Sequence, residues 1–200
     1  EDYANNKGVE FTLDIRPTRY FSGGLTYTYS VVKGSASSET EQYPGTQEST
    51  QLYYLDWDRT HIFNASGTYT IPNDEGPIIF GSQIFDNMDF SLILKASSGS
   101  PYTPSGRDIG FVEKNSLRQP GLYNIDFMIG KEFEFPGNFR LRLFAEILNL
   151  TDHRNILYVY GDTGDPDYTT VGNHSTEYMQ DPSNYGPPRS VRLGFTMRFN

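Results

Sequence analysis

Residues 190–200, with the sequence SVRLGFTMRFN, decide the fold class of this chain. Apolar side chains occupy every second position, and polar residues or glycine stand between them; the apolar set is Val191, Leu193, Phe195, Met197 and Phe199. Strict alternation with a period of two is typical of a β-strand with one apolar face and one wet face. A tilted strand of about 9–11 residues crosses the hydrocarbon layer of a bilayer. The segment is therefore long enough to be a membrane-spanning strand.

The same alternation recurs along the whole chain. It predicts seven strands, at residues 8–16, 21–33, 59–71, 88–98, 122–135, 139–150 and 190–199. The pattern of residues 77–87 fits either the extension of a strand or a turn. An eighth strand there would give a small closed barrel, but the order of the loop lengths argues against it.

The connections between these strands alternate in length. Residues 17–20, 72–87 and 136–138 form the shorter set, and residues 34–58, 99–121 and 151–189 form the long set. Transmembrane barrels have short turns on the periplasmic side and long loops outside the cell. The alternation therefore predicts extracellular long loops and a periplasmic C-terminus. A soluble sandwich has no reason to sort its loops in this way, and it would cover the apolar face with a second sheet.

The composition agrees with a barrel in the outer membrane. Aromatic residues make up 15% of the chain, with 15 Tyr and 14 Phe, and such barrels carry aromatic girdles at both interfaces. The mean hydropathy of −0.56 fits a polar lumen face. A run of about 18 apolar residues is absent, so no helical span is predicted. The chain has no cysteine, which excludes a disulfide framework and a thiolate metal site.

The net charge of −9 lies in two of the predicted outer loops. Residues 34–58 carry a net charge of −5 and residues 152–189 carry −4. Acidic surfaces repel phosphates, so no nucleic-acid partner is predicted. The simplest interpretation of these acidic loops is solubility, and they mildly disfavour polyanionic ligands.

Seven strands do not close a barrel of this kind. Bacterial single-chain barrels have an even number of strands, eight at least, and an open edge in lipid would leave backbone groups unsatisfied. The chain also begins in polar sequence without the apolar core of a leader peptide. We therefore expect residues 1–200 to be the C-terminal part of a single larger barrel domain. The predicted fold class is all-β, an antiparallel transmembrane β-barrel segment of about seven strands.

Several motifs, taken in order, resemble a known family. They are NNKGVEFTLDIRP at 5–17, DRTHIFNASGTYTIP at 58–72, SGSPYTPSG at 98–106, FAEILNLTD at 144–152 and PPRSVRLGFTMRF at 187–199. Together they resemble the last seven or so strands of a TonB-dependent outer-membrane receptor. In that family a plug domain fills a 22-stranded barrel, and a TonB box couples uptake to the inner membrane. Neither the plug nor the box is found in these 200 residues.

The resemblance implies active uptake of a scarce substrate across the outer membrane of a Gram-negative cell. The substrate would be an iron chelate, a cobalamin, a glycan or a peptide. The implied partners are outer-membrane lipid, the remaining barrel strands, a plug domain and the TonB complex. It also implies a barrel-assembly signal at Phe199, although Asn200 follows where such proteins usually end on the aromatic residue. The alternative is a small β-barrel or a soluble β-sheet binding module, such as an adhesin, without transport.

Candidate chemistry is sparse, and we expect no enzyme activity and no cofactor. The three histidines, His61, His153 and His174, form no pair at metal-binding spacing. The segment GDTGDPD at 161–167 resembles a calcium loop in composition but lacks the EF-hand spacing, so Ca²⁺ binding stays open. Aromatic side chains of the outer loops could stack on a ligand, or could equally belong to the interface girdle. The candidates are Tyr53, Tyr54, Tyr158, Tyr160, Tyr168 and Tyr178.

Overall fold

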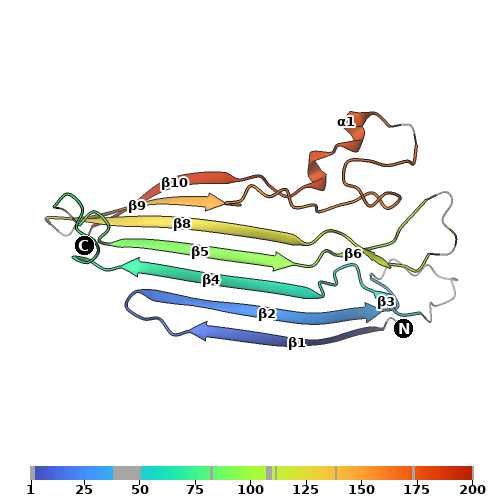
Figure 1. The fold of residues 1–200 in the computed structure, drawn as a ribbon, viewed down its shortest axis with the longest axis horizontal. Helices are drawn as coiled ribbons and strands as arrows, with labels where there is room; N and C mark the ends of the chain where they lie inside the picture. Colours follow the sequence, from blue (N-terminus) through green and yellow to red (C-terminus); the bar gives the residue numbers. More distant parts are fainter. Residues whose placement is uncertain are drawn as a thin grey trace.

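The computed structural model describes residues 3–37, 51–81, 83–106, 110, 112–137, 139–172 and 174–199. An antiparallel meander of seven long strands dominates it (Figure 1). The strands are β1 (Ala4–Ile15), β2 (Phe21–Gly34), β4 (His61–Ile71), β5 (Met88–Ser97), β8 (Leu122–Phe135), β9 (Phe139–Leu148) and β10 (Ser190–Phe199). The all-β prediction and the seven predicted strands are confirmed. The largest change is in β1, which begins at Ala4 rather than at residue 8.

Each long strand pairs with its neighbours in sequence, in the order β1-β2-β4-β5-β8-β9-β10. The register keeps apolar side chains on one face, because Leu13, Leu25, Ala65, Leu94 and Ile125 are successive partners across five strands. A shift of one residue would move such a set to the opposite face. The alternation read from the sequence is therefore compatible with this register and excludes shifts by an odd number of residues.

The opposite face of the sheet is polar. Its matching row consists of Thr12, Thr26, Asn64, Lys95 and Asn124, again successive partners from β1 to β8. Each of these residues is adjacent in sequence to a residue of the apolar row and points to the opposite face, as the two-residue period requires. The sheet thus separates an apolar face from a face of hydroxyl, amide and charged groups.

The connections are sorted by length between the two ends of the sheet. In Figure 1 the shorter turns lie at the left end and the long loops at the right end. The described part of residues 77–87 contains no strand, which settles that segment as a turn. This turn reaches back to the sheet, because Lys131 Nζ on β8 donates to the backbone oxygen and to Oδ1 of Asp86, at 2.6 and 2.5 Å.

Five short elements in the long loops have no signal in the sequence pattern. They are β3 (Tyr53–Tyr54), β6 (Pro101–Tyr102), β7 (Leu117–Arg118), α1 (Thr176–Met179) and the 3₁₀ turn η2 (Pro182–Asn184). β3 adds to the edge of β2 beyond the first residue of β4, and β6 pairs with β7. Segments of two to four residues are too short to display a periodicity, so sequence reasoning misses them.

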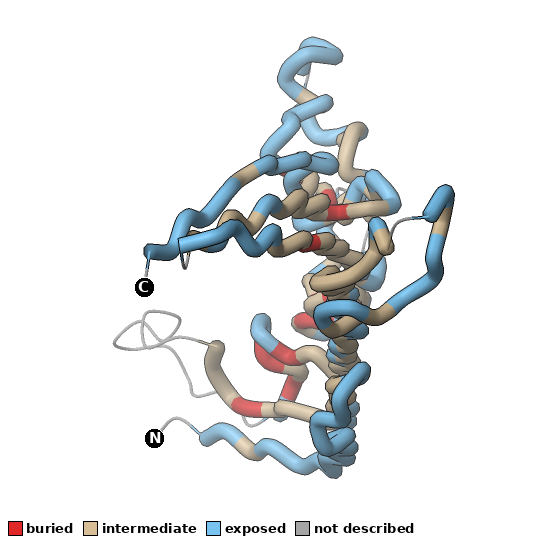
Figure 2. Tube along the Cα trace, turned by 90° about the vertical axis from the view of Figure 1, so that its left-hand side faces the viewer, coloured by how far each residue is buried: buried red, intermediate tan, exposed pale blue. Residues whose placement is uncertain are grey.

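The sheet is curved, and it is not closed. In Figure 2, viewed from one end of the sheet, both ends of the chain lie toward the same side of the curved sheet. Among the described residues, β1 and β10 each have a partner strand on one side only. Both are therefore edge strands with unpaired backbone groups.

Burial is concentrated in the loops rather than in the sheet. The apolar face is open along its length, with Val9 71% exposed and Leu193 81% exposed. The large side chains that are fully buried, Leu55 and Asp58, lie at the loop end. No second sheet packs on the apolar face within the described ranges.

The only α-helix among the described residues is the four-residue α1. No helix in that part of the chain is long and apolar enough to span a membrane.

Candidate functional site

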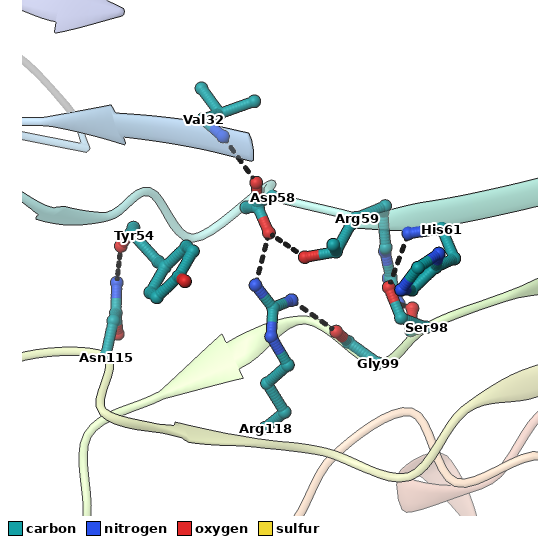
Figure 3. A network of polar contacts seen from close by, with 10 residues as sticks. Val32, Tyr54, Asp58, Arg59, His61, Ser98, Gly99, Asn115 and Arg118 are labelled. Atoms are coloured by element: carbon teal, nitrogen blue, oxygen red, sulfur yellow. Dashed lines mark hydrogen bonds and ion pairs between the residues drawn. The ribbon is translucent and has the colours of Figure 1, made fainter. Parts of the chain in front are cut away.

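A buried carboxylate joins two of the long loops at the loop end of the sheet. Asp58 is fully buried, and its side chain accepts hydrogen bonds from the backbone N–H of Val32 at 2.6 Å and from Thr60 Oγ1 at 3.0 Å. Arg118 Nη2 lies 2.5 Å from Oδ2, the oxygen that also accepts from Thr60, and Arg118 Nη1 donates to the Gly99 carbonyl at 3.1 Å (Figure 3). Because Val32 lies near the end of β2 and Arg118 belongs to β7, Asp58 holds the 98–121 loop against the sheet.

Asn115 forms a second attachment between the same loops. Its backbone is left-handed, with φ of 56°, a conformation that asparagine tolerates better than most residues. Its Nδ2 donates to the Tyr54 carbonyl and to Asp56 Oδ1, both at 2.6 Å. The side chain is nearly buried and its hydrogen bonds satisfy it, as a buried amide requires.

The candidate ligand residues Tyr53 and Tyr54 lie within this attachment. Tyr53 is 7% exposed, its hydroxyl donates to the Ser35 carbonyl at 3.0 Å, and Lys114 Nζ lies 4.5 Å from its ring centroid. The Tyr54 ring has Lys33 Nζ at 4.5 Å and Arg118 Cζ at 4.8 Å. Cations over aromatic rings stabilise the loop base. The structure therefore gives both tyrosines packing contacts and leaves Tyr53 little free surface.

The other four candidates lie in the loop of residues 149–189. Tyr158, Tyr168 and Tyr178 are each more than half exposed. The Tyr160 hydroxyl donates to the Met179 carbonyl at 3.1 Å, and the Tyr158 and Tyr160 rings meet edge to face at 6.0 Å. The Tyr178 ring stacks on His174 at 4.3 Å. This loop thus presents exposed aromatic surface, and Tyr53 and Tyr54 belong to a different loop.

The base of the 149–189 loop is fixed by the NLTD turn. Asn149 and Asp152 both have a φ of 54°, which lets the chain reverse immediately after β9. Asn149 Nδ2 donates to the carbonyls of His153 and Pro187, at 3.0 and 3.1 Å. Asp152 accepts from the backbone N–H of Arg189 at 2.8 Å. The turn therefore connects the start of the loop to its end, just before β10.

Residues 162–167 are the segment for which the sequence left Ca²⁺ binding open. Two of its carboxylates accept hydrogen bonds from other residues of the same loop. Asp162 accepts from Thr169 Oγ1 at 2.9 Å and from Thr170 Oγ1 at 2.7 Å, and Asp167 accepts from the Tyr185 hydroxyl at 2.7 Å. Desolvation alone would raise the pKa of Asp162, but the hydrogen bonds from Thr170 and Thr169 hold it below its usual value. Within the described residues, no three His, Asp or Glu side chains are grouped to hold a metal ion.

Phe199, the predicted assembly signal, lies on the apolar face at the turn end of β10. Its ring stacks on Phe139 of β9, with centroids 5.0 Å apart, and Phe139 in turn meets Phe135 of β8 at 5.3 Å. An aromatic row therefore runs across the last three strands. Its role in assembly stays a prediction.

A pocket of about 610 Å³ lies on the polar face near the loop end, and we call it the wall pocket. Its polar lining includes Arg59, Asn64, Lys95, Asn124, Asp126 and Arg192. These residues extend from the segment before β4 to β10, so one hollow connects five neighbouring strands of the sheet. Its apolar lining includes Ile62, Leu122, Leu148 and Leu157. A volume of this size suits a small organic ligand.

One side of the wall pocket is supplied by the 149–189 loop. The side-chain amide of Asn155 bonds to β8 twice: Oδ1 accepts from Tyr123 N at 2.8 Å, and Nδ2 donates to the Tyr123 carbonyl at 2.7 Å. Gly186 N donates to the Asn155 carbonyl at 2.7 Å and brings Pro187 and Pro188 to the same wall. Sequence reasoning missed this pocket, because its members are single polar positions on separate strands.

Comparison of the chain with protein-family models, with curated proteins and with solved structures found no match.

Proposed function

We propose that this chain forms part of the wall and the outer loops of a TonB-dependent receptor, which takes up a scarce substrate across a bacterial outer membrane. The exposed apolar face carries the proposal. Large apolar side chains are open to the surroundings on all seven long strands, from Val9 on β1 to Leu193 on β10. A soluble protein rarely leaves so large an apolar patch uncovered, whereas lipid would cover it without cost.

The two free edges support a larger barrel. β1 and β10 have unpaired backbone groups among the described residues, and such edges are not tolerated in hydrocarbon. Further strands must therefore pair with both edges, and the polar face would then line the lumen. A plug domain in that lumen would contact the polar face. The missing strands and the plug are thus the first partners of this chain.

The sorting of the loops supports an orientation. The long loops would face the exterior and the short turns the periplasm, as in other barrels of this class. Aromatic side chains stand near both ends of the apolar face, where girdles would meet the two interfaces; they include Tyr27, Tyr29, Phe135, Phe139 and Phe199. The exposed tyrosines of the 149–189 loop would then be among the first groups that an arriving ligand meets.

Transport rather than catalysis is proposed, with an iron chelate, a cobalamin, a glycan or a peptide as substrate. The alternative is a binding module or adhesin without transport. That alternative predicts a protein that stays in solution without detergent. It would also need another cover for the apolar face.

Cysteine labelling in intact cells tests both the membrane location and the orientation, since these residues contain no cysteine of their own. Single variants are Glu177→Cys, in the long 149–189 loop, and Pro17→Cys, in the turn between β1 and β2. A maleimide that cannot cross the outer membrane should label only the first in intact cells and both after lysis. The unsubstituted protein is the control for cysteines elsewhere in the parent polypeptide. Recovery of the chain in the soluble fraction, or equal labelling of both variants in intact cells, would refute the proposal.

A further inference from the structure

The wall pocket is positively charged within an acidic chain. Three cationic side chains line it, Arg59, Lys95 and Arg192, against the single carboxylate of Asp126, which leaves a net charge of +2. The chain as a whole carries −9. A hollow whose charge opposes that of the surrounding protein concentrates ligands of the opposite sign. We propose that the wall pocket binds the carboxylate or phosphate group of an organic ligand, with Lys95 and Arg59 as its charged contacts.

The lone acid of the wall pocket is already occupied by protein donors. Asp126 Oδ1 accepts from Asn124 Nδ2 at 2.6 Å and from the backbone N–H of Asn149 at 2.9 Å. The first bond lies within β8, and the second joins β8 to the residue that follows β9. Oδ1 of Asp126 is therefore held by the wall itself, and this single carboxylate leaves two of the three cationic charges unbalanced.

The cations, in contrast, keep unused donors. Lys95 is exposed and makes neither a hydrogen bond nor an ion pair with any described residue. Arg59 uses Nη1 to donate to the Ser98 carbonyl at 3.1 Å and has no carboxylate partner in the described part of the chain (Figure 3). Arg192 is the exception, since its Nη1 lies 3.6 Å from Glu146 Oε2. Lys95 and Arg59 therefore keep N–H groups free, and a ligand that uses them must bring acceptor oxygens.

The neighbours of Lys95 extend the donor set. Lys95 on β5 has two direct partners on the neighbouring strands, Asn64 on β4 and Asn124 on β8. The three side chains form one polar row that faces the pocket. An ammonium flanked by two amides can bind several oxygens of one anionic group. The apolar lining of Leu122, Leu148 and Leu157 accepts a hydrocarbon skeleton beside that group. The pocket thus suits an organic anion better than a bare inorganic ion.

This inference rests on the proposed function, because the polar face faces a lumen only in a closed barrel. The acidic loops disfavour a ligand with many negative charges, whereas the wall pocket favours one localised anionic group. The two features together select for a ligand with a single anionic group on a larger body. The plain alternative is a solvated lysine on the lumen wall, and it predicts no dependence of binding on Lys95.

Ligand-observed saturation-transfer NMR on the full-length protein in detergent tests the inference. The probes are benzoate, phenyl phosphate and benzyl alcohol, which share a ring and differ in the charge of the head group. We expect binding of one or both anions and weaker binding of the alcohol. Binding of benzoate alone would identify a carboxylate ligand, and binding of phenyl phosphate alone a phosphate ligand.

The matched variants are Lys95→Gln and Lys7→Gln. Lys7 is an exposed lysine on the apolar face of β1, so its loss changes the net charge equally but leaves the wall pocket intact. Loss of a charged contact should weaken anion binding about tenfold in Lys95→Gln and leave it unchanged in Lys7→Gln. Equal binding of the alcohol, or equal affinities in the two variants, would overturn the inference. The cysteine labelling is independent of it, so the proposed function can stand when this inference fails.

Discussion

The Arg142 guanidinium on β9 contacts the Asp89 carboxylate on β5, with Nη2 2.7 Å from Oδ1, although β8 lies between the two strands. The contact is possible because Gly130 occupies the intervening position on β8. A Cβ at Gly130 would lie 2.6 Å from Arg142 Nη2 and 2.7 Å from Asp89 Oδ1. The missing side chain thus leaves space for an ion pair that joins three strands on the polar face.

Gly130→Ala should therefore force Arg142 and Asp89 apart. Because the pair is partly exposed, we expect a loss of up to about 1 kcal/mol in the free energy of unfolding. In an Arg142→Gln background the same change should be neutral or stabilising, since alanine restricts the unfolded chain. Thermal unfolding in detergent of the single and double variants measures this coupling.

The control for this prediction is Gly67→Ala on β4. A Cβ at Gly67 would find its nearest neighbour, the Phe21 ring, at 3.5 Å, which is an ordinary contact. Its midpoint of unfolding should stay unchanged or rise. Equal effects of the two glycine substitutions would show that the Arg142–Asp89 contact does not depend on Gly130.

The fold of the sheet could be predicted because its determinants are local and periodic. The alternation in residues 190–199 is repeated on each strand, and three of the six connections between long strands are shorter turns, which favours pairing in sequence order. The alternation predicts that the residues of the row from Leu13 to Ile125 share one face, and the structure adds that they are direct partners. The two open edges, β1 and β10, could also be predicted, because seven strands do not close a barrel of this kind.

The contacts of the loops could not be predicted, because they depend on residues far apart in sequence. Asp58 and Arg118 are separated by 60 positions, and no periodicity connects them. The sequence placed Tyr53 among the aromatic residues of an outer loop that could contact a ligand, yet its ring packs under Lys114. The wall pocket combines single polar positions from several strands, and only the register brings Asn64, Lys95 and Asn124 into one row.

Asp58→Asn should release the 98–121 loop from the sheet. The substitution keeps the shape of the side chain but removes the charge that Arg118 meets at 2.5 Å in a buried position. Breaking a buried ion pair costs about 3 kcal/mol. We expect faster proteolytic cleavage between residues 98 and 121, measured by mass spectrometry. Glu177→Gln, in the exposed first turn of α1, is the control, and equal cleavage rates in both variants would contradict the prediction.

The 149–189 loop should loosen in acid because of Asp162. Its pKa in the fold is lowered below 3.8, so its hydrogen bonds to Thr169 and Thr170 contribute stability that is fully present above pH 3.8. That contribution is lost as the pH falls through the lowered pKa. Amide protection of residues 161–172, corrected for intrinsic exchange rates, should drop in this range. Asp162→Asn should show low protection at every pH; a wild-type loop that stays equally protected on both sides of the range would contradict the prediction.

A lysine substitution should have different effects on the two faces of β10. Leu193 lies on the apolar face and is 81% exposed, whereas Thr196 lies on the polar face. If lipid covers the apolar face, Leu193→Lys places an ammonium in hydrocarbon, at a cost of about 2–4 kcal/mol near the middle of the bilayer. Thr196→Lys would face the lumen and should be tolerated. The amount of folded protein in the outer membrane, read from its resistance to heat denaturation on a gel, measures both variants. Equal yields would mean that the two faces of β10 meet the same solvent, which a strand in a membrane wall cannot do.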